Sequence, residues 1–318
     1  MRPTFHVSRA RGCFATASFL IGCCVMVSPS AAQTPTAHVS DVRETPTVLA
    51  IRRASPAVVN IHGQKTVRTT AAGMAGALGP DSFKQVNGMG TGVVIDPRGY
   101  VITNYHVVED VNDIRIELAN GEEATADLDA SRIRNDLALI KVNTDSPLQT
   151  IPRGTSSDLM VGESVIAIGN AFGYVHTSTQ GIISALHRDV PVNETQDYRD
   201  LIQISAGINP GNSGGPLLNI DGEMIGINVA VRVGAQGIGF AIPVDQAMDV
   251  AARLLNAERL GGVHHGIIPV SKHQQPGIVA RSVLTNSPAE RAGIRPGDVI
   301  TQVNAVKIVR PLDLERAM

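Results

Sequence analysis

Short apolar runs separated by turn signals recur along the middle of this chain, from Gly88 to about Ile242. The runs occupy residues 92–95, 100–102, 114–118, 137–142 and 164–168. Turn sequences such as Asp-Pro-Arg-Gly and Asn-Gly break the pattern between them. Many short strands at regular spacing are typical of β-sandwiches and barrels, and they argue against a parallel sheet. We therefore predict a mainly β fold.

The composition agrees with this prediction. Aromatic residues make up 3% of the chain and Trp is absent, so the core must consist of Val, Ile, Leu and Ala. That bias, together with 31 Gly, favours β-structure with many turns. A chain of 318 residues forms one large domain or two smaller ones. The formal net charge of -2 gives no sign of a basic patch, so we expect no nucleic-acid partner.

Residues 1–32 have the order of a secretory signal peptide. Three arginines precede an apolar run at residues 13–27, and small residues follow at 28–32. The run is shorter than the roughly 20 residues of a membrane span, so we predict no transmembrane span in the mature chain. The sequence therefore predicts a periplasmic or otherwise exported protein, with an uncleaved N-terminal anchor as an alternative.

All three cysteines lie in this segment, so cleavage after residue 32 would leave a mature chain without a disulfide. Cys23 ends a Leu-Ile-Gly-Cys sequence, which also fits a bacterial lipoprotein cleavage pattern. In that case Cys23 would carry lipid and tether the protein to a membrane.

The remaining segments differ in character. Residues 33–46 are polar and contain Pro, which predicts a linker. Residues 47–54 fit a short helix. Residues 62–88 hold scattered Gly, Thr and Ala with little periodicity, so we expect a long mobile loop there. Apolar residues later recur at near-helical spacing, which predicts a linker helix over residues 246–261.

One serine lies in a Gly-rich segment that suits a nucleophile. Ser213 stands within Asn-Pro-Gly-Asn-Ser-Gly-Gly-Pro-Leu at residues 209–217. Glycine permits a tight turn around a reactive hydroxyl, and it lets the N–H groups of Gly211 and Ser213 converge on a developing oxyanion. A bare Gly-x-Ser-Gly is usually an ordinary turn, but the extended segment is far rarer by chance. We predict Ser213 as the nucleophile and these two N–H groups as the oxyanion hole.

A serine nucleophile needs an imidazole base and a carboxylate that fixes the tautomer of that base. His106 ends a strand-like run, and Asp136 begins another. Taken alone, they would be a structural histidine and a solvated strand end. Together with Ser213 they have the chain order His, Asp, Ser, which is the order of chymotrypsin-type triads and not of subtilisin or α/β-hydrolases. We predict a catalytic triad of His106, Asp136 and Ser213.

The segments around these residues resemble the HtrA/DegP family of trypsin-like serine proteases. The resemblance extends from about residue 47 to the end and implies a protease domain over residues 47–245. It implies a chymotrypsin/trypsin-like double β-barrel with the triad between the barrels, no cofactor, and a homotrimer or higher oligomer of trimers. The matching segments are Thr-Asn-Tyr-His-Val-Val at 103–108, Asn-Asp-Leu-Ala-Leu-Ile-Lys at 135–141, Gly-Asn-Ser-Gly-Gly-Pro at 211–216, and residues 90–96, 168–173 and 237–243.

The resemblance also implies a function, an ATP-independent endopeptidase that degrades unfolded or damaged proteins. By alignment to the trypsin-like pattern, Gly207 lies at the base of the primary specificity pocket. A pocket without a carboxylate should not select Arg or Lys, so we predict aliphatic residues before the cleaved bond. The alternative is a chaperone-like peptide-binding protein with latent proteolysis. An esterase on another fold conflicts with the order of the triad.

The last segment, residues 262–318, resembles a PDZ domain of the same family through Ser-Pro-Ala at 287–289 and the Gly-Asp-containing run at 292–300. The resemblance implies that His265, Gly266, Ile267 and Ile268 receive a peptide C-terminus by β-augmentation. The sequence stops inside the expected groove helix, and the closing strands do not follow, so we predict a partial PDZ domain.

Three residues in or next to this loop raise separate questions. The family commonly has Gly where Pro269 stands, and proline offers no N–H to a docking strand. His264 and His265 are adjacent, but nothing supplies further metal ligands at a suitable spacing. We therefore predict solvated loop histidines and no metal site.

Overall fold

The computed structural model describes residues 43–69, 82–132, 135–171, 174–191, 197–229, 237–258, 265–271 and 277–317. The predicted signal peptide, with Cys23, and most of the predicted linker lie outside these residues. None of the helices within the described ranges is long and apolar enough to span a membrane.

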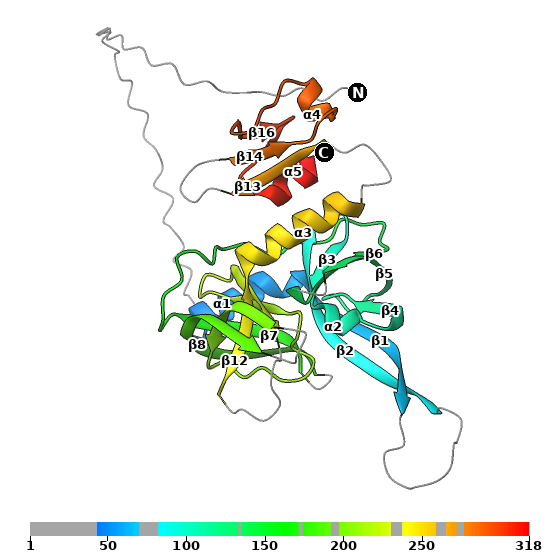
Figure 1. Cartoon of the computed structure of the whole chain (residues 1–318). Helices are drawn as coiled ribbons and strands as arrows, with labels where there is room; N and C mark the ends of the chain where they lie inside the picture. The colour runs from blue at the N-terminus through cyan, green and yellow to red at the C-terminus, as the bar shows by residue number, and fades with distance from the viewer. Residues whose placement is uncertain are drawn as a thin grey trace, which may run out of the picture.

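The first part of the chain closes into an antiparallel barrel with the strand order β1-β2-β3-β6-β5-β4 (Figure 1). Fully buried Ile and Leu side chains such as Ile61, Ile102 and Leu139 fill it, as the low aromatic content predicted. Its strands are β1 (Val58–Thr69), β2 (Ser82–Asp96), β3 (Tyr100–Thr103), β4 (Val111–Glu117), β5 (Glu123–Arg132) and β6 (Leu137–Val142).

A second closed barrel follows, with the strand order β10-β11-β12-β9-β8-β7. Ile183, Ile202 and Leu217 are among its buried core residues. Its strands are β7 (Ser164–Ala171), β8 (Tyr174–Pro191), β9 (Asp197–Ile204), β10 (Pro216–Leu218), β11 (Met224–Val229) and β12 (Gly239–Pro243). The predicted double β-barrel is therefore confirmed.

The prediction of a long loop over residues 62–88 is wrong for most of its length. Strands β1 and β2 pair without interruption from Val58 opposite Val93 to Thr69 opposite Ser82, as a hairpin that projects from the barrel (Figure 1). The backbone hydrogen bonds of such a pair need no alternation of apolar and polar residues. Sequence periodicity reports the burial of one strand face, so it could not reveal this hairpin.

Helices cover the outside of the barrels. Helix α1 (Pro46–Ala54) is capped by the Thr45 side chain, and η1 (Ser55–Ala57) leads from it into β1. Helix α3 (Val244–Glu258) begins directly after β12, two residues before the predicted start, and it contacts β5 and β6 of the first barrel and β11 of the second. Figure 1 shows α3 lying between the barrels and the C-terminal region.

The C-terminal region is a small sheet unit with its own core of residues such as Ile278, Ile300 and Leu314. In the described part of the chain, β13 is an edge strand of the sheet β13-β14-β15. This is the PDZ-like arrangement that the sequence predicted. Its elements are β13 (Ile267–Ser271), β14 (Ile278–Val283), α4 (Pro288–Arg291), β15 (Val299–Ile300), β16 (Gln302–Val303), β17 (Val306–Lys307) and α5 (Pro311–Ala317).

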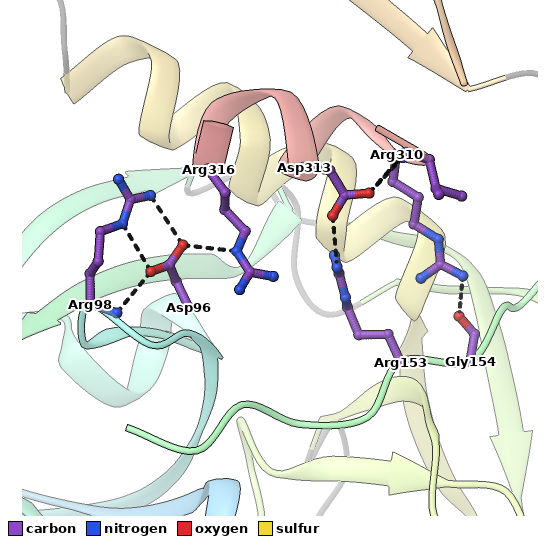
Figure 2. Close-up of polar contacts among 8 residues, drawn as sticks. Asp96, Arg98, Arg153, Gly154, Arg310, Asp313 and Arg316 are labelled. Carbon is purple, nitrogen blue, oxygen red and sulfur yellow. Dashed lines mark hydrogen bonds and ion pairs between the residues drawn. The ribbon is translucent and has the colours of Figure 1, made fainter. Parts of the chain in front are cut away.

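Helix α5 attaches this unit to the barrels. It packs on α3, and its Leu312 is buried in the same core cluster as the first barrel. Two ion pairs flank this contact, Arg153 Nη2 to Asp313 Oδ1 at 2.9 Å and Arg316 Nε to Asp96 Oδ2 at 3.2 Å (Figure 2). Asp96 is 1% exposed and also binds the Arg98 guanidinium of its own turn. The attachment therefore combines apolar packing with charge pairs that are largely shielded from water.

The Arg153–Asp313 pair yields a pH-dependent prediction. Burial alone would raise the pKa of Asp313, but the Arg153 guanidinium and the N–H groups of Arg310 and Val309 outweigh burial and lower the pKa below 3.8. A lowered pKa contributes stability at neutral pH that is lost as the pH falls through the folded-state value. We expect Asp313→Asn to lower the free energy of unfolding by about 1–3 kcal/mol at pH 7, measured by urea unfolding.

The difference from wild type should begin to shrink below about pH 4, where the carboxyl of the unfolded chain becomes neutral, and it should be lost as the pH falls through the lower folded-state pKa of Asp313. Asp113→Asn is the matched control, because Asp113 pairs with Arg115 on the surface and exposed pairs contribute only about 0–1 kcal/mol. Equal effects of the two substitutions at pH 7 would contradict a structural role for the pair.

Candidate active site

His106 and Asp136 are held together by several hydrogen bonds in the first barrel. Helix α2 (Tyr105–Val108) carries His106, whose Nδ1 lies 2.7 Å from Asp136 Oδ2. The backbone N–H of His106 donates to Asp136 Oδ1 at 2.9 Å. The main-chain carbonyl of Asp136 accepts from Asn104 Nδ2 and from the N–H of Tyr105, both at 3.1 Å. The turn that carries His106 is therefore bonded to both the side chain and the backbone of Asp136.

Asp136 is 1% exposed, so the interpretation as a solvated strand end is wrong. It precedes β6 with a left-handed backbone (φ 49), a conformation that Asp adopts more readily than most residues. An ionised carboxylate only accepts hydrogen bonds, so the proton between Asp136 and the ring belongs to His106 Nδ1. The other ring nitrogen, Nε2, then carries the lone pair that a general base needs.

The loop before Ser213 is shaped by its local sequence. Pro210 and Gly211 occupy the centre of a turn in which the N–H of Asn212 donates to the carbonyl of Asn209 at 3.0 Å. Gly211 has φ 102, and Pro followed by a positive-φ Gly is the sequence of a type II turn. Ser213 follows this turn and is 4% exposed.

Thr91 in β2 ties this loop to the first barrel. Its hydroxyl donates to the carbonyl of Gly211 at 2.7 Å and accepts from the N–H of Asn170 at 2.9 Å. Its backbone N–H donates to the carbonyl of Ser213 at 2.9 Å. Thr91 is fully buried, so these bonds are shielded from water. Thr91 lies in one of the segments that match the family, but the sequence indicates no role for it, because its partners lie far away in the chain.

The Ser213 loop also lies against the segment that carries His106. A Cβ on Gly214 would collide with Thr91 O and Thr103 Oγ1, and it would stand 3.1 Å from Asn104 N. Gly214 also has φ 82, so this close approach requires glycine. The structure therefore brings together the loop of Ser213 and the His106–Asp136 pair, from opposite barrels.

Gly207 lies six residues before Ser213 and is exposed. Its carbonyl accepts a hydrogen bond from Thr179 Oγ1 at 2.9 Å. The neighbouring Ile208 reaches Gly239, where an added Cβ would stand 2.7 Å from Ile208 Cγ1. Gly207 is thus bonded to a threonine hydroxyl, whereas Ile208 packs against the core of the second barrel.

One residue that touches the pair was not predicted from the sequence. Tyr198 of β9 donates its hydroxyl to Asp136 Oδ2 at 2.6 Å, and it is 8% exposed. Burial, the charge of Asp136 and this hydrogen bond all raise the pKa of Tyr198. A tyrosine at the start of a strand carries no sequence signal for such a contact.

The prediction of solvated loop histidines is wrong for His265. This residue is 5% exposed, its Nδ1 accepts from the N–H of Ile267 at 2.9 Å, and its Nε2 lies 3.0 Å from Glu315 Oε1 on α5. Gly266 has φ 82, Ile267 is buried and Ile268 is 45% exposed. His265 therefore links the predicted peptide-binding loop to α5. His264 lies outside the described residues. Over those residues no group of three or more potential metal ligands occurs.

The two barrels, the His–Asp pair of the first and the Gly-rich serine loop of the second define a trypsin-like serine peptidase class. The trypsin-like peptidase domain family matches residues 90–227, and the PDZ domain family matches residues 279–317. The chain belongs to the HtrA/DegP family of trypsin-like serine proteases with a PDZ domain.

Curated relatives support this assignment. A probable periplasmic serine endoprotease, DegP-like, of Halomonas elongata is 38% identical over 80% of this chain and 61% of its own length. Putative serine protease HhoA of Synechocystis sp. is 37% identical over 91% of this chain and 81% of its own length. Serine endoprotease DegS of Haemophilus influenzae is 37% identical over 80% of this chain and 74% of its own length. The chain thus spans about three fifths of the length of DegP-like relatives.

A solved structure has the same arrangement. The HtrA-type protease AlgW with decapeptide superposes with a TM-score of 0.57 and 30% sequence identity. The match covers 85% of this chain and 90% of that chain.

The buried Thr91 hydroxyl yields a second prediction. Thr91→Val keeps the shape of the side chain but leaves the carbonyl of Gly211 and the N–H of Asn170 without this partner. We expect the free energy of unfolding to fall by about 1–3 kcal/mol in urea unfolding. Thr91→Ser, which keeps the hydroxyl and loses only a methyl group, is the control and should lose about 1 kcal/mol. A smaller loss for Val than for Ser would show that the hydroxyl bonds contribute nothing.

Proposed function

We propose that this chain is an exported serine endopeptidase in which His106, Asp136 and Ser213 form the catalytic triad. The observation that carries the proposal is the 2.7 Å contact between His106 Nδ1 and buried Asp136, beside a serine loop clamped by Thr91. This contact fixes the tautomer in which Nε2 can accept a proton. The names of the curated relatives, which are serine endoproteases, support the same activity.

The proposed mechanism is acyl transfer through a covalent intermediate. His106 Nε2 takes the Ser213 hydroxyl proton as Oγ bonds to the substrate carbonyl carbon, and Asp136 stabilises the imidazolium that results. The N–H groups of Gly211 and Ser213 donate to the oxyanion. The imidazolium gives its proton to the leaving amine as the peptide bond breaks, and water, deprotonated by His106, then hydrolyses the acyl-enzyme. This cycle needs neither ATP nor a cofactor.

The substrates follow from the pocket and from the family. Gly207 brings no carboxylate to the base of the proposed pocket, which favours aliphatic residues before the cleaved bond. We infer that unfolded or damaged proteins are the substrates, in the periplasm, because such proteins expose aliphatic residues and the DegP-like relatives are named periplasmic endoproteases. A homotrimer, or a higher oligomer of trimers, is the assembly that the family suggests.

The C-terminal unit offers a second peptide-binding site. We infer that His265, Gly266, Ile267 and Ile268 receive a peptide C-terminus, since β13 is an edge strand of the described sheet and Ile268 is exposed. Pro269 removes one N–H from this edge, so a docked strand would pair with the residues on either side of it.

The nucleophile assignment is tested by Ser213→Ala. We expect casein degradation to fall at least about 10⁴-fold, because no other group supplies the attacking oxygen. Ser146→Ala is the matched control, since this serine lies exposed in the loop between β6 and β7. Equal casein degradation by Ser213→Ala and wild type would refute the assignment. Suppression of aggregation that survives in Ser213→Ala would reveal a chaperone activity in addition.

The specificity assignment is tested at Gly207. We expect wild type to cleave after Val or Ala at least about tenfold faster than after Arg, measured as kcat/KM on peptides that differ only at that position. Among the residues that the structure describes, an added Cβ at Gly207 meets nothing nearer than Thr179 Cγ2, at 4.0 Å, so the backbone site admits the Cβ of Gly207→Asp. This variant should shift the preference toward Arg. An Arg preference in wild type would overturn the assignment.

A further inference from the structure

Tyr198 makes a contact that joins the two barrels at the carboxylate of Asp136. Asp136 precedes β6 of the first barrel, whereas Tyr198 belongs to β9 of the second. The hydroxyl lies 2.6 Å from Oδ2, the same oxygen that faces His106 Nδ1 at 2.7 Å. Oδ1 accepts the backbone N–H of His106 at 2.9 Å. Hydrogen bonds to both oxygens therefore fix the orientation of the buried carboxylate.

The direction of the Tyr198 bond follows from the ionisation of both groups. A carboxylate has no proton to give, so the phenol is the donor. The raised pKa of Tyr198 keeps the phenol protonated throughout the range in which a serine protease works. Two protons, one from the imidazole and one from the phenol, thus point at Oδ2.

The backbone places this hydroxyl firmly. Tyr198 pairs with Val190 of β8 in the ladder of the second barrel, and the Tyr198 side chain is among the buried core residues. A phenol held in this way restrains rotation of the Asp136 carboxylate about its χ angles, because rotation would leave a buried hydroxyl without its acceptor.

We propose, on the basis of the function proposed above, that Tyr198 is a positioning residue of the triad. Its hydroxyl orients the Asp136 carboxylate and takes a share of the negative charge on Oδ2. Sharing weakens the pull of Oδ2 on the His106 ring proton, so the imidazolium is stabilised less than by a carboxylate bonded to histidine alone. Tyr198 would thus set both the direction and the strength of the contact between Asp136 and His106.

Tyr198→Phe removes only the hydroxyl and tests both parts of the proposal. We expect kcat on a peptide substrate to fall about tenfold with KM within about twofold of wild type, because Tyr198 is buried and its hydroxyl faces Asp136. We also expect the acidic limb of the pH profile of kcat/KM to move upward by several tenths of a pH unit, since Asp136 then stabilises the imidazolium more strongly.

The matched control is Tyr100→Phe, which removes a hydroxyl from a half-buried tyrosine whose ring lies beside Arg98 and Lys141. It should retain the wild-type kcat and acidic limb. Active sites are counted with a fluorophosphonate, which phosphonylates the nucleophilic serine with loss of fluoride, so that unfolded protein does not lower the apparent kcat.

The outcomes separate this inference from the proposed function. An acidic limb that stays at the wild-type position in Tyr198→Phe overturns the inference, whatever happens to kcat or to the melting temperature, because a purely structural tyrosine would change only those. Loss of activity in Ser213→Ala alongside that result would leave the proposed triad intact. Activity retained in Ser213→Ala would remove the triad itself.

Discussion

The buried carboxylate of Asp136 is the interaction on which the site depends. Taking an ionised carboxylate out of water is unfavourable unless its oxygens are hydrogen-bonded. Here the partners are His106, through its ring and its backbone, and the hydroxyl of Tyr198. Because the same bonds that satisfy the charge also orient the histidine, the stability of the site and its proposed chemistry rest on one set of contacts.

The second requirement is that the Ser213 loop keeps a fixed position against the first barrel. Thr91 meets this requirement with bonds to Gly211, Ser213 and Asn170, while Gly214 permits the close approach. An oxyanion hole needs backbone N–H groups in fixed directions. In a mobile loop, part of the free energy of substrate binding would be lost in ordering the loop. Thr91, a buried residue of β2, holds the loop in place through its hydrogen bonds and does not itself occupy the site.

The C-terminal unit is built on a comparable principle at a smaller scale. His265 and Glu315 join the predicted peptide-binding loop to α5, and α5 meets the barrels through Arg153–Asp313 and Leu312. The predicted peptide-binding loop and the barrels therefore both contact the short helix α5. The His265–Glu315 and Arg153–Asp313 contacts each pair polar or charged groups that are largely shielded from water, which gives a more specific geometry than the apolar packing of Leu312 alone.

The sequence by itself determined what is local. Apolar runs and turns predicted a mainly β fold, and the family resemblance implied the double β-barrel. The chain order of His106, Asp136 and Ser213 predicted the class of peptidase, and Pro210-Gly211 favours the turn in which it lies. Only the tertiary structure decided what joins distant residues. Tyr198 and Asp136 are 62 residues apart, and Thr91 and Gly211 are 120 apart. The hairpin of β1 and β2 and the burial of His265 were mispredicted for the same reason. Periodicity reports which face of an element is buried, whereas these contacts exist only because barrel closure and helix packing bring remote side chains together.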